Sequence, residues 1–169
     1  MIFDLIDMRS FSNLWYWIAL GVIWSSASHW VLGVPYDMIS RARREGGQVQ
    51  EDLETLVRIN VDRMLHASRN HGPVLIGVVC FMITVLALLG FMYAIEFAQA
   101  VLFLFVPLIV LGYLSLRTSV KVEAGEGQGA ELFRRLGRHR LSVQFLGMVS
   151  IFVTSLYGMY VNINFSLQG

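Results

Sequence analysis

The stretch PVLIGVVCFMITVLALLGFMYAIEFAQAVLFLFVPLIVLGYLSL, residues 73–116, decides the fold of this chain. It contains one charged residue, Glu96, and it is about twice as long as the roughly 20 apolar residues that cross a bilayer as a helix. We therefore expect two membrane spans, 73–95 and 98–116, joined by a tight hairpin. The polar side chains of Glu96 and Gln99 mark the hairpin at one membrane surface.

Two further apolar stretches of spanning length flank this pair. One covers residues 14–34 and stops at Pro35, and the other covers residues 141–163. The chain has 169 residues, of which 56% are hydrophobic and 15% are charged, whereas a soluble domain carries about a quarter charged residues. The sequence thus predicts an all-α fold: a four-helix transmembrane bundle forming a single integral membrane domain over residues 1–169.

The basic residues indicate how the bundle is oriented. The loops 35–72 and 117–140 hold 12 of the 13 arginines and lysines, and the remaining one is Arg9. Short loops rich in arginine and lysine stay in the cytoplasm. We therefore predict a multi-pass protein of the bacterial inner (cytoplasmic) membrane, with both loops cytoplasmic and both termini periplasmic.

Each of these loops contains an amphipathic segment. In 51–65, apolar residues recur at helical spacing, and 129–142 repeats the pattern more briefly. We expect two amphipathic interfacial helices, the first separated from the next span by Gly72-Pro73 and the second running directly into 141–163. Their apolar positions are Leu53, Leu56, Val57, Val61, Met64 and Leu65, and Leu132, Phe133 and Leu136.

Small residues at helical spacing are candidates for helix packing, since they let backbones approach closely inside a membrane. One row lies in the first span and a second in the last, and either could contact another helix of the bundle or dock onto another subunit. The rows are Gly21, Ser25 and Ser28, and Gly147, Ser150, Thr154 and Gly158.

His29 is the candidate cofactor ligand, because it belongs to the most polar part of any span. It could bind haem or quinone or relay protons, or simply be hydrogen-bonded within the bundle. No second intramembrane histidine exists, so haem would have to be shared with a partner subunit. We otherwise predict no cofactor and no metal site, since Cys80 is the one cysteine.

The basic run 134–140 is the candidate lipid-headgroup site. Arginines beside a membrane attract anionic headgroups, each with about 1 kcal/mol, so a bound phospholipid is expected here and nucleic acid is not. The residues are Arg134, Arg135, Arg138 and Arg140.

Four segments of the sequence, Met8–Trp15, Ser28–Met38, Asp52–Glu54 and Arg58–Val61, resemble a group of uncharacterised multi-span inner-membrane proteins of alphaproteobacteria. Some members are labelled a component of the SufBCD complex, which implies a link to iron–sulfur assembly through docking at the cytoplasmic loops. The layout is also similar to the MAPEG family of four-span glutathione-using enzymes. That family's Asn-then-Glu pattern is not found around Arg63–Pro73.

The sequence lacks a Walker A loop, paired carboxylates and the HExxH motif. We therefore expect a non-catalytic integral membrane subunit, scaffold or assembly factor with membrane-protein partners in a respiratory, photosynthetic or metallocluster-related complex. One alternative is a small membrane enzyme or redox-cofactor protein that uses His29. A further alternative is a homo-oligomeric channel lined by Ser25, Ser28, Thr154 and Asn162.

Overall fold

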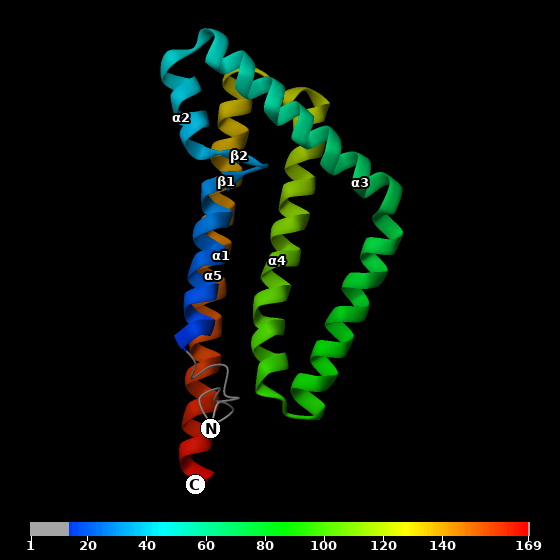
Figure 1. Cartoon of the computed structure of the whole chain (residues 1–169), viewed down its shortest axis with the longest axis vertical. Helices are drawn as coiled ribbons and strands as arrows, with labels where there is room; N and C mark the ends of the chain where they lie inside the picture. The colour runs from blue at the N-terminus through cyan, green and yellow to red at the C-terminus, as the bar shows by residue number, and fades with distance from the viewer. Residues whose placement is uncertain (1–13, 169) are drawn as a thin grey trace.

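The computed structural model describes residues 14–168, so the predicted periplasmic N-terminal segment lies outside the described residues. Within these residues the chain is all-α apart from one two-stranded hairpin (Figure 1). The elements are α1 (Leu14–His29), β1 (Trp30–Val31), β2 (Val34–Pro35), α2 (Tyr36–Glu45), α3 (Gly47–Ala87), η2 (Leu88–Met92), α4 (Glu96–Lys121), η3 (Val122–Glu126) and α5 (Gly129–Gln168), where η denotes a short π-helix.

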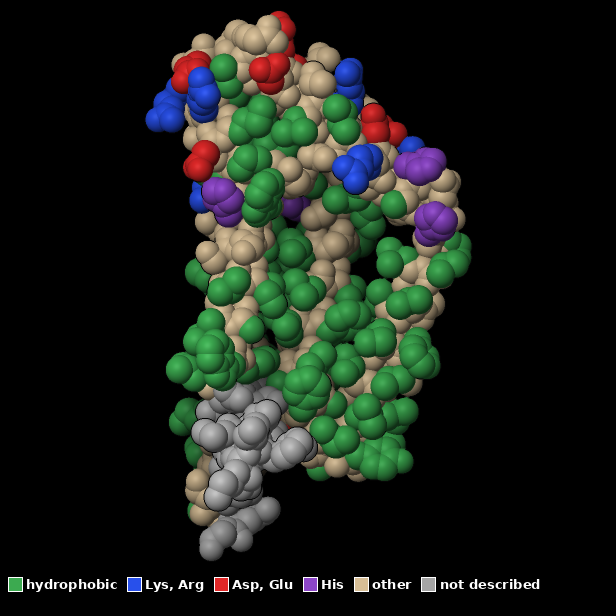
Figure 2. Space-filling model, in the orientation of Figure 1, with side chains coloured by type: hydrophobic (Ala, Val, Ile, Leu, Met, Phe, Trp, Pro, Cys, Tyr) green, Lys and Arg blue, Asp and Glu red, His purple; other side chains and the backbone are tan. Residues whose placement is uncertain are grey.

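Three helical stretches of the described chain are long and apolar enough to cross a membrane: Gly47–Met92, Glu96–Glu126 and Gly129–Asn164. Charged side chains gather at one end of the molecule, and hydrophobic side chains predominate over the rest of the described surface in this view (Figure 2). Phe81 is 66% exposed and Phe152 is 64% exposed. Aromatic surface of this extent is suited to lipid and is consistent with the predicted membrane class.

The helix at the start of the described chain is shorter than predicted. It ends at His29 rather than Val34, because residues 30–35 form the antiparallel hairpin of β1 and β2. The backbone φ is +51° at Leu32 and +77° at Gly33, and positive φ at both central residues is what a two-residue type I′ hairpin turn requires. α1 therefore has 16 residues, a length of roughly 24 Å.

The predicted break near Glu96 is present, slightly earlier in the chain. The helical path ends at Met92, residues 93–95 form the turn, and α4 begins at Glu96. The side chain of Gln99 closes the hairpin, because its Nε2 donates to the Gly90 carbonyl oxygen at 2.6 Å. The Tyr157 hydroxyl donates to Gln99 Oε1 at 3.1 Å, which ties the hairpin to α5.

The predicted separation at Gly72-Pro73 is wrong. Pro73 lies inside α3, which continues from Gly47 to Ala87 and changes direction part way (Figure 1). A proline inside a helix removes the hydrogen bond to the carbonyl four residues earlier and bends the helix rather than always ending it. By contrast, the predicted run-through of 129–142 into the last span is confirmed, since α5 is one helix.

The charged end of the molecule has its own hydrophobic core. We call this end the polar cap: residues 30–71 and 117–140. Leu53, Val57, Val61 and Leu65 form one buried face of α3, and it packs with Leu132 and Leu136 of α5 and with the β-hairpin. The apolar faces of the two loop segments therefore contact each other. Val31, Leu32, Val34, Ile39, Ala42 and Val122 complete the buried cluster.

Beyond the polar cap, α1 packs along α5 (Figure 1). The Trp24 ring, 4% exposed, lies on Gly147, where an added Cβ would be 3.0 Å from Trp24 Cε3. The Tyr16 hydroxyl donates to the Ala100 carbonyl oxygen of α4 at 3.1 Å. A tryptophan fills the space left by a glycine, and this contact fixes where α1 sits.

Candidate functional site

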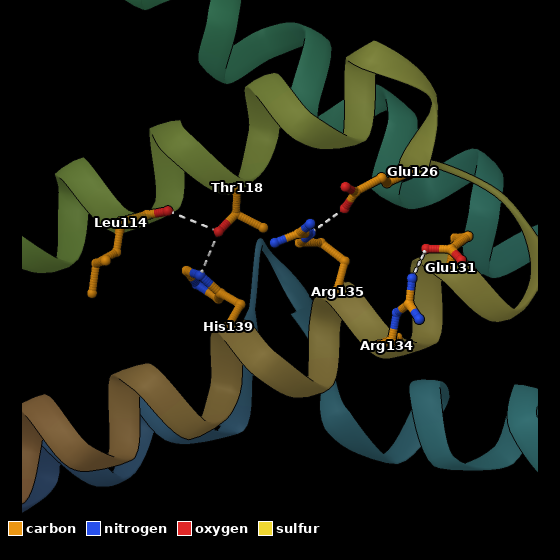
Figure 3. A network of polar contacts seen from close by, with 7 residues as sticks. All are labelled: Leu114, Thr118, Glu126, Glu131, Arg134, Arg135 and His139. Carbon is orange, nitrogen blue, oxygen red and sulfur yellow. Dashed lines mark hydrogen bonds and ion pairs between the residues drawn. The ribbon is translucent and has the colours of Figure 1, made fainter.

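A buried hydrogen bond joins α4 to α5 where these helices enter the polar cap (Figure 3). The Thr118 hydroxyl donates to the Leu114 carbonyl oxygen at 2.8 Å and lies 3.0 Å from His139 Nδ1. Since a hydroxyl has one hydrogen, His139 Nδ1–H must donate to Thr118. The contact therefore fixes the imidazole tautomer, and His139 is 5% exposed.

Burial lowers the pKa of His139 below its ordinary value of 6.5, because a charged imidazolium loses its hydration there. The folded-state pKa of His139 lies below its unfolded-state pKa. The neutral imidazole therefore contributes stability that is present above the unfolded-state pKa and is lost as the pH falls through the folded-state pKa. We expect the unfolding temperature in detergent to drop between about pH 7.5 and about pH 5.5. His139→Asn should reduce this drop in unfolding temperature, whereas substitution of the exposed His66 by Asn should leave it unchanged. An equal drop in the wild type and in both variants would contradict the assignment of the pH dependence to His139.

Two of the four predicted headgroup arginines are engaged with carboxylates. Arg135 pairs with Glu126, and Arg134 pairs with Glu131 on the same helix (Figure 3). The hydrogen bond from Arg135 lowers the pKa of Glu126 below its ordinary value. Arg135 is only 14% exposed, so it holds η3 against α5 rather than facing outward.

A third ion pair connects α3 to η3. Arg69 binds the Glu123 carboxylate through both guanidinium nitrogens, at 3.0 and 2.7 Å. This hydrogen bonding lowers the pKa of Glu123 and raises that of Arg69. Both side chains are exposed to solvent, so the pair contributes orientation more than stability.

The other two predicted headgroup arginines lack a carboxylate partner within residues 14–168. Arg138 is exposed. The Arg140 guanidinium carbon lies 3.5 Å from the Tyr36 ring centroid, and its buried Nε has no hydrogen-bond partner in the described chain. An arginine stacked on an aromatic face keeps donors for an anion while its position is fixed. Arg138 and Arg140 are thus the two of the four candidates that have no carboxylate partner among the described residues.

The beginning of α5 is held by a side chain of α3. Glu54 Oε1 accepts hydrogen bonds from the Gly129 backbone N–H at 2.9 Å and from Gln50 Nε2 at 2.8 Å. The first N–H groups of a helix have no partner within it, and a carboxylate there is favoured by the helix dipole. Two loops distant in the sequence are therefore joined by an N-cap.

The two predicted rows of small residues occupy different environments. Gly147, Ser150, Thr154 and Gly158 of α5 are all buried. In α1, Gly21 and Ser25 are exposed and Ser28 is half-buried, and an added Cβ at Gly21 would meet nothing within 4 Å. The row of α5 is covered by the chain itself, and the row of α1 is largely uncovered by the described residues.

His29 is the last residue of α1 and is exposed, with its ring edge-on to Trp30 at 6.0 Å between centroids. Within the described residues, no group of three or more histidine, cysteine or acidic side chains is placed to hold a metal ion. The structure therefore places nothing beside His29 in this part of the chain that would complete a metal site.

Sequence reasoning missed Tyr36, Thr118 and Glu126 as partners of the basic run, and Glu54 as the partner of the Gly129 backbone N–H. The three glutamates in 117–140, beside five arginines, were the available signal for ion pairing. Nothing in the sequence indicated which arginine meets a carboxylate and which meets an aromatic ring. The polar cap offers one cationic side chain fixed on an aromatic ring, Arg140, one exposed cationic side chain, Arg138, and a hydrogen-bonded frame.

In comparisons with protein-family models, curated proteins and solved structures, none matches this chain.

Proposed function

We propose that this is a four-span protein of the bacterial inner membrane, with α1 as the first span and the polar cap in the cytoplasm. The three long apolar helices support the membrane part, and the basic residues of the polar cap support the orientation. α1 adds a fourth apolar helix that packs along α5. In this topology both termini are periplasmic. The two predicted interfacial helices lie at the membrane surface, and the sides that are not buried in the core of the polar cap face the lipid headgroups.

We propose further that the protein is a non-catalytic subunit or assembly factor of a larger membrane complex. The observation that carries this is the open row Gly21, Ser25 and Ser28 on α1, beside the closed row on α5. A face of small residues gives its full packing energy only when another helix covers it. A transmembrane helix of a partner subunit would fit this face, and the resemblance noted above makes metallocluster assembly one candidate context.

A leucine at Gly21 tests the proposal. Purification of the native protein in mild detergent should yield a partner identified by mass spectrometry, and Gly21→Leu should lose it while keeping its own unfolding temperature. Gly112→Leu on α4, also open around its Cβ position, is the matched control and should keep the partner. A wild-type chain that runs alone, as a monomer or small homo-oligomer, would refute the subunit role.

We also propose that Arg138 and Arg140 hold an anionic phospholipid headgroup at the cytoplasmic surface. Neither has a carboxylate partner among residues 14–168, and Tyr36 fixes the Arg140 guanidinium. The expected attraction is about 1 kcal/mol for each basic residue near the surface.

A further inference from the structure

An apolar cavity of about 280 Å³ lies between α4 and α5, within the stretches able to span a membrane. Val106 and Pro107 of α4 line one side of it, and Leu146 and Val153 of α5 line the other. Val106 is 43% and Val153 is 44% exposed, so the cavity opens sideways on the hydrophobic surface. A cavity of about 150 Å³ admits benzene, so this one has room for roughly ten carbon atoms.

The lining of this cavity selects hydrocarbon. It carries no charged side chain, and its surface is almost wholly apolar. Ser150 and Thr154 present almost no oxygen surface to it, and the Thr154 hydroxyl donates to the Ser150 carbonyl oxygen at 2.7 Å. The rings of Phe91 and Phe103 complete the lining. A polar group placed here would lose its hydration without a hydrogen bond in return, whereas a hydrocarbon chain would gain van der Waals contacts.

A row of side chains on α5 leads from the polar cap to this cavity. Arg138, Ser142, Leu146 and Val149 follow one another at helical spacing on one face, and the last two line the cavity. Leu146 is half-buried and the other three are exposed. The helix rises roughly 12 Å from Arg138 to Leu146 and roughly 16 Å to Val149. The hydrocarbon of one leaflet is about 15 Å deep, so an acyl chain that starts beside Arg138 ends in the cavity.

We propose that this cavity holds one acyl chain of a phospholipid whose anionic headgroup lies at Arg138. The inference rests on the topology and the headgroup site proposed above, and it adds the binding of the lipid chain. The chain lies along the row on α5 and enters between Val106 and Val153. The lipid belongs to the leaflet beside the polar cap, because the turn at residues 93–95, at the opposite surface, has no arginine or lysine to hold a headgroup.

The test uses the full chain in mild detergent, with binding measured by native mass spectrometry. The probes are two phosphatidylglycerols with the same anionic headgroup, one with 16-carbon acyl chains and one with six-carbon chains, which end short of the cavity. We expect the wild type to bind the 16-carbon lipid about tenfold more tightly, because only its chain contacts the lining. Val153→Phe should remove most of this preference by filling the mouth, and Val106→Phe should do the same from the opposite wall. Neither change should alter the binding of the six-carbon lipid.

Val78→Phe on α3 is the matched control, because Val78 is 53% exposed and does not line the cavity. It should keep the preference for the longer chains. Arg138→Gln should weaken the binding of both lipids by the same factor, since both carry the headgroup. Equal affinities of the wild type for the two lipids, or a preference that survives both cavity variants, would overturn the acyl-chain inference while an effect of Arg138→Gln upheld the headgroup site. Unchanged binding of both lipids by Arg138→Gln would overturn the headgroup site, and this inference with it.

Discussion

Leu53→Ala is expected to lower the free energy of unfolding by about 3 kcal/mol, because the fully buried side chain leaves a cavity that its neighbours fill only in part. Leu53 is 0% exposed and belongs to the core of the polar cap. Leu132→Ala, on the α5 side of the same core, should have an effect of similar size. The free energy can be measured by denaturant titration in detergent.

Ile59→Ala is the control for this pair. It lies on the same helix as Leu53 but is 48% exposed, so its effect should stay below about 1 kcal/mol. If the three variants lose similar amounts, the two loops do not share a core. The same result would favour independent helices lying flat on the membrane, with their apolar faces in lipid.

Gly147→Leu is expected to displace α1 from α5 and to destabilise the protein by about 2–3 kcal/mol, because overpacking forces rigid neighbours apart. An added Cβ would already be 3.0 Å from Trp24 Cε3, and an indole ring cannot bend away. Gly137→Leu on the same helix should be tolerated, since the space around Gly137 is open.

A second substitution sharpens this test. Trp24→Ala alone removes a large buried ring, for which about 3–5 kcal/mol is the usual loss. Combined with Gly147→Leu, the loss should be clearly smaller than the sum of the two, since the leucine occupies the vacated space. Strict additivity in the double-mutant cycle would mean that these residues are not in contact.

Apolar length alone predicted the three long helices and the turn near Glu96, because a bilayer imposes a length that few other environments require. It could not place the end of α1. Trp30 to Val34 is as apolar as the helix before it, and only the φ values of Leu32 and Gly33 distinguish a hairpin from another helical turn. The Asn60 side chain, which donates to the Gly33 carbonyl oxygen at 3.3 Å, is 27 residues away.

The candidate sites divide in the same way. The helical spacing of small residues identified the rows of α1 and α5. It could not show that the row of α5 is buried and the row of α1 largely exposed, because this depends on which helices pack together. Local composition found the basic run, yet the partners Glu126 and Tyr36 come from separate elements. The buried Ser150 hydroxyl, which has no hydrogen-bond partner among the described residues, has no sequence signal, since serines in helices normally bond to their own backbone.

The core of the polar cap is assembled from residues 31–65 and 122–136, which lie on either side of the long apolar stretch 73–116 in the sequence. A ribosome therefore releases the first half long before the second. In the proposed topology, Leu53, Val57, Val61 and Leu65 remain uncovered by α5 until the intervening stretch has crossed the membrane and returned. In that topology, closure of the polar cap requires both α3 and α4 to be inserted, and an insertion error in either would leave this apolar face uncovered.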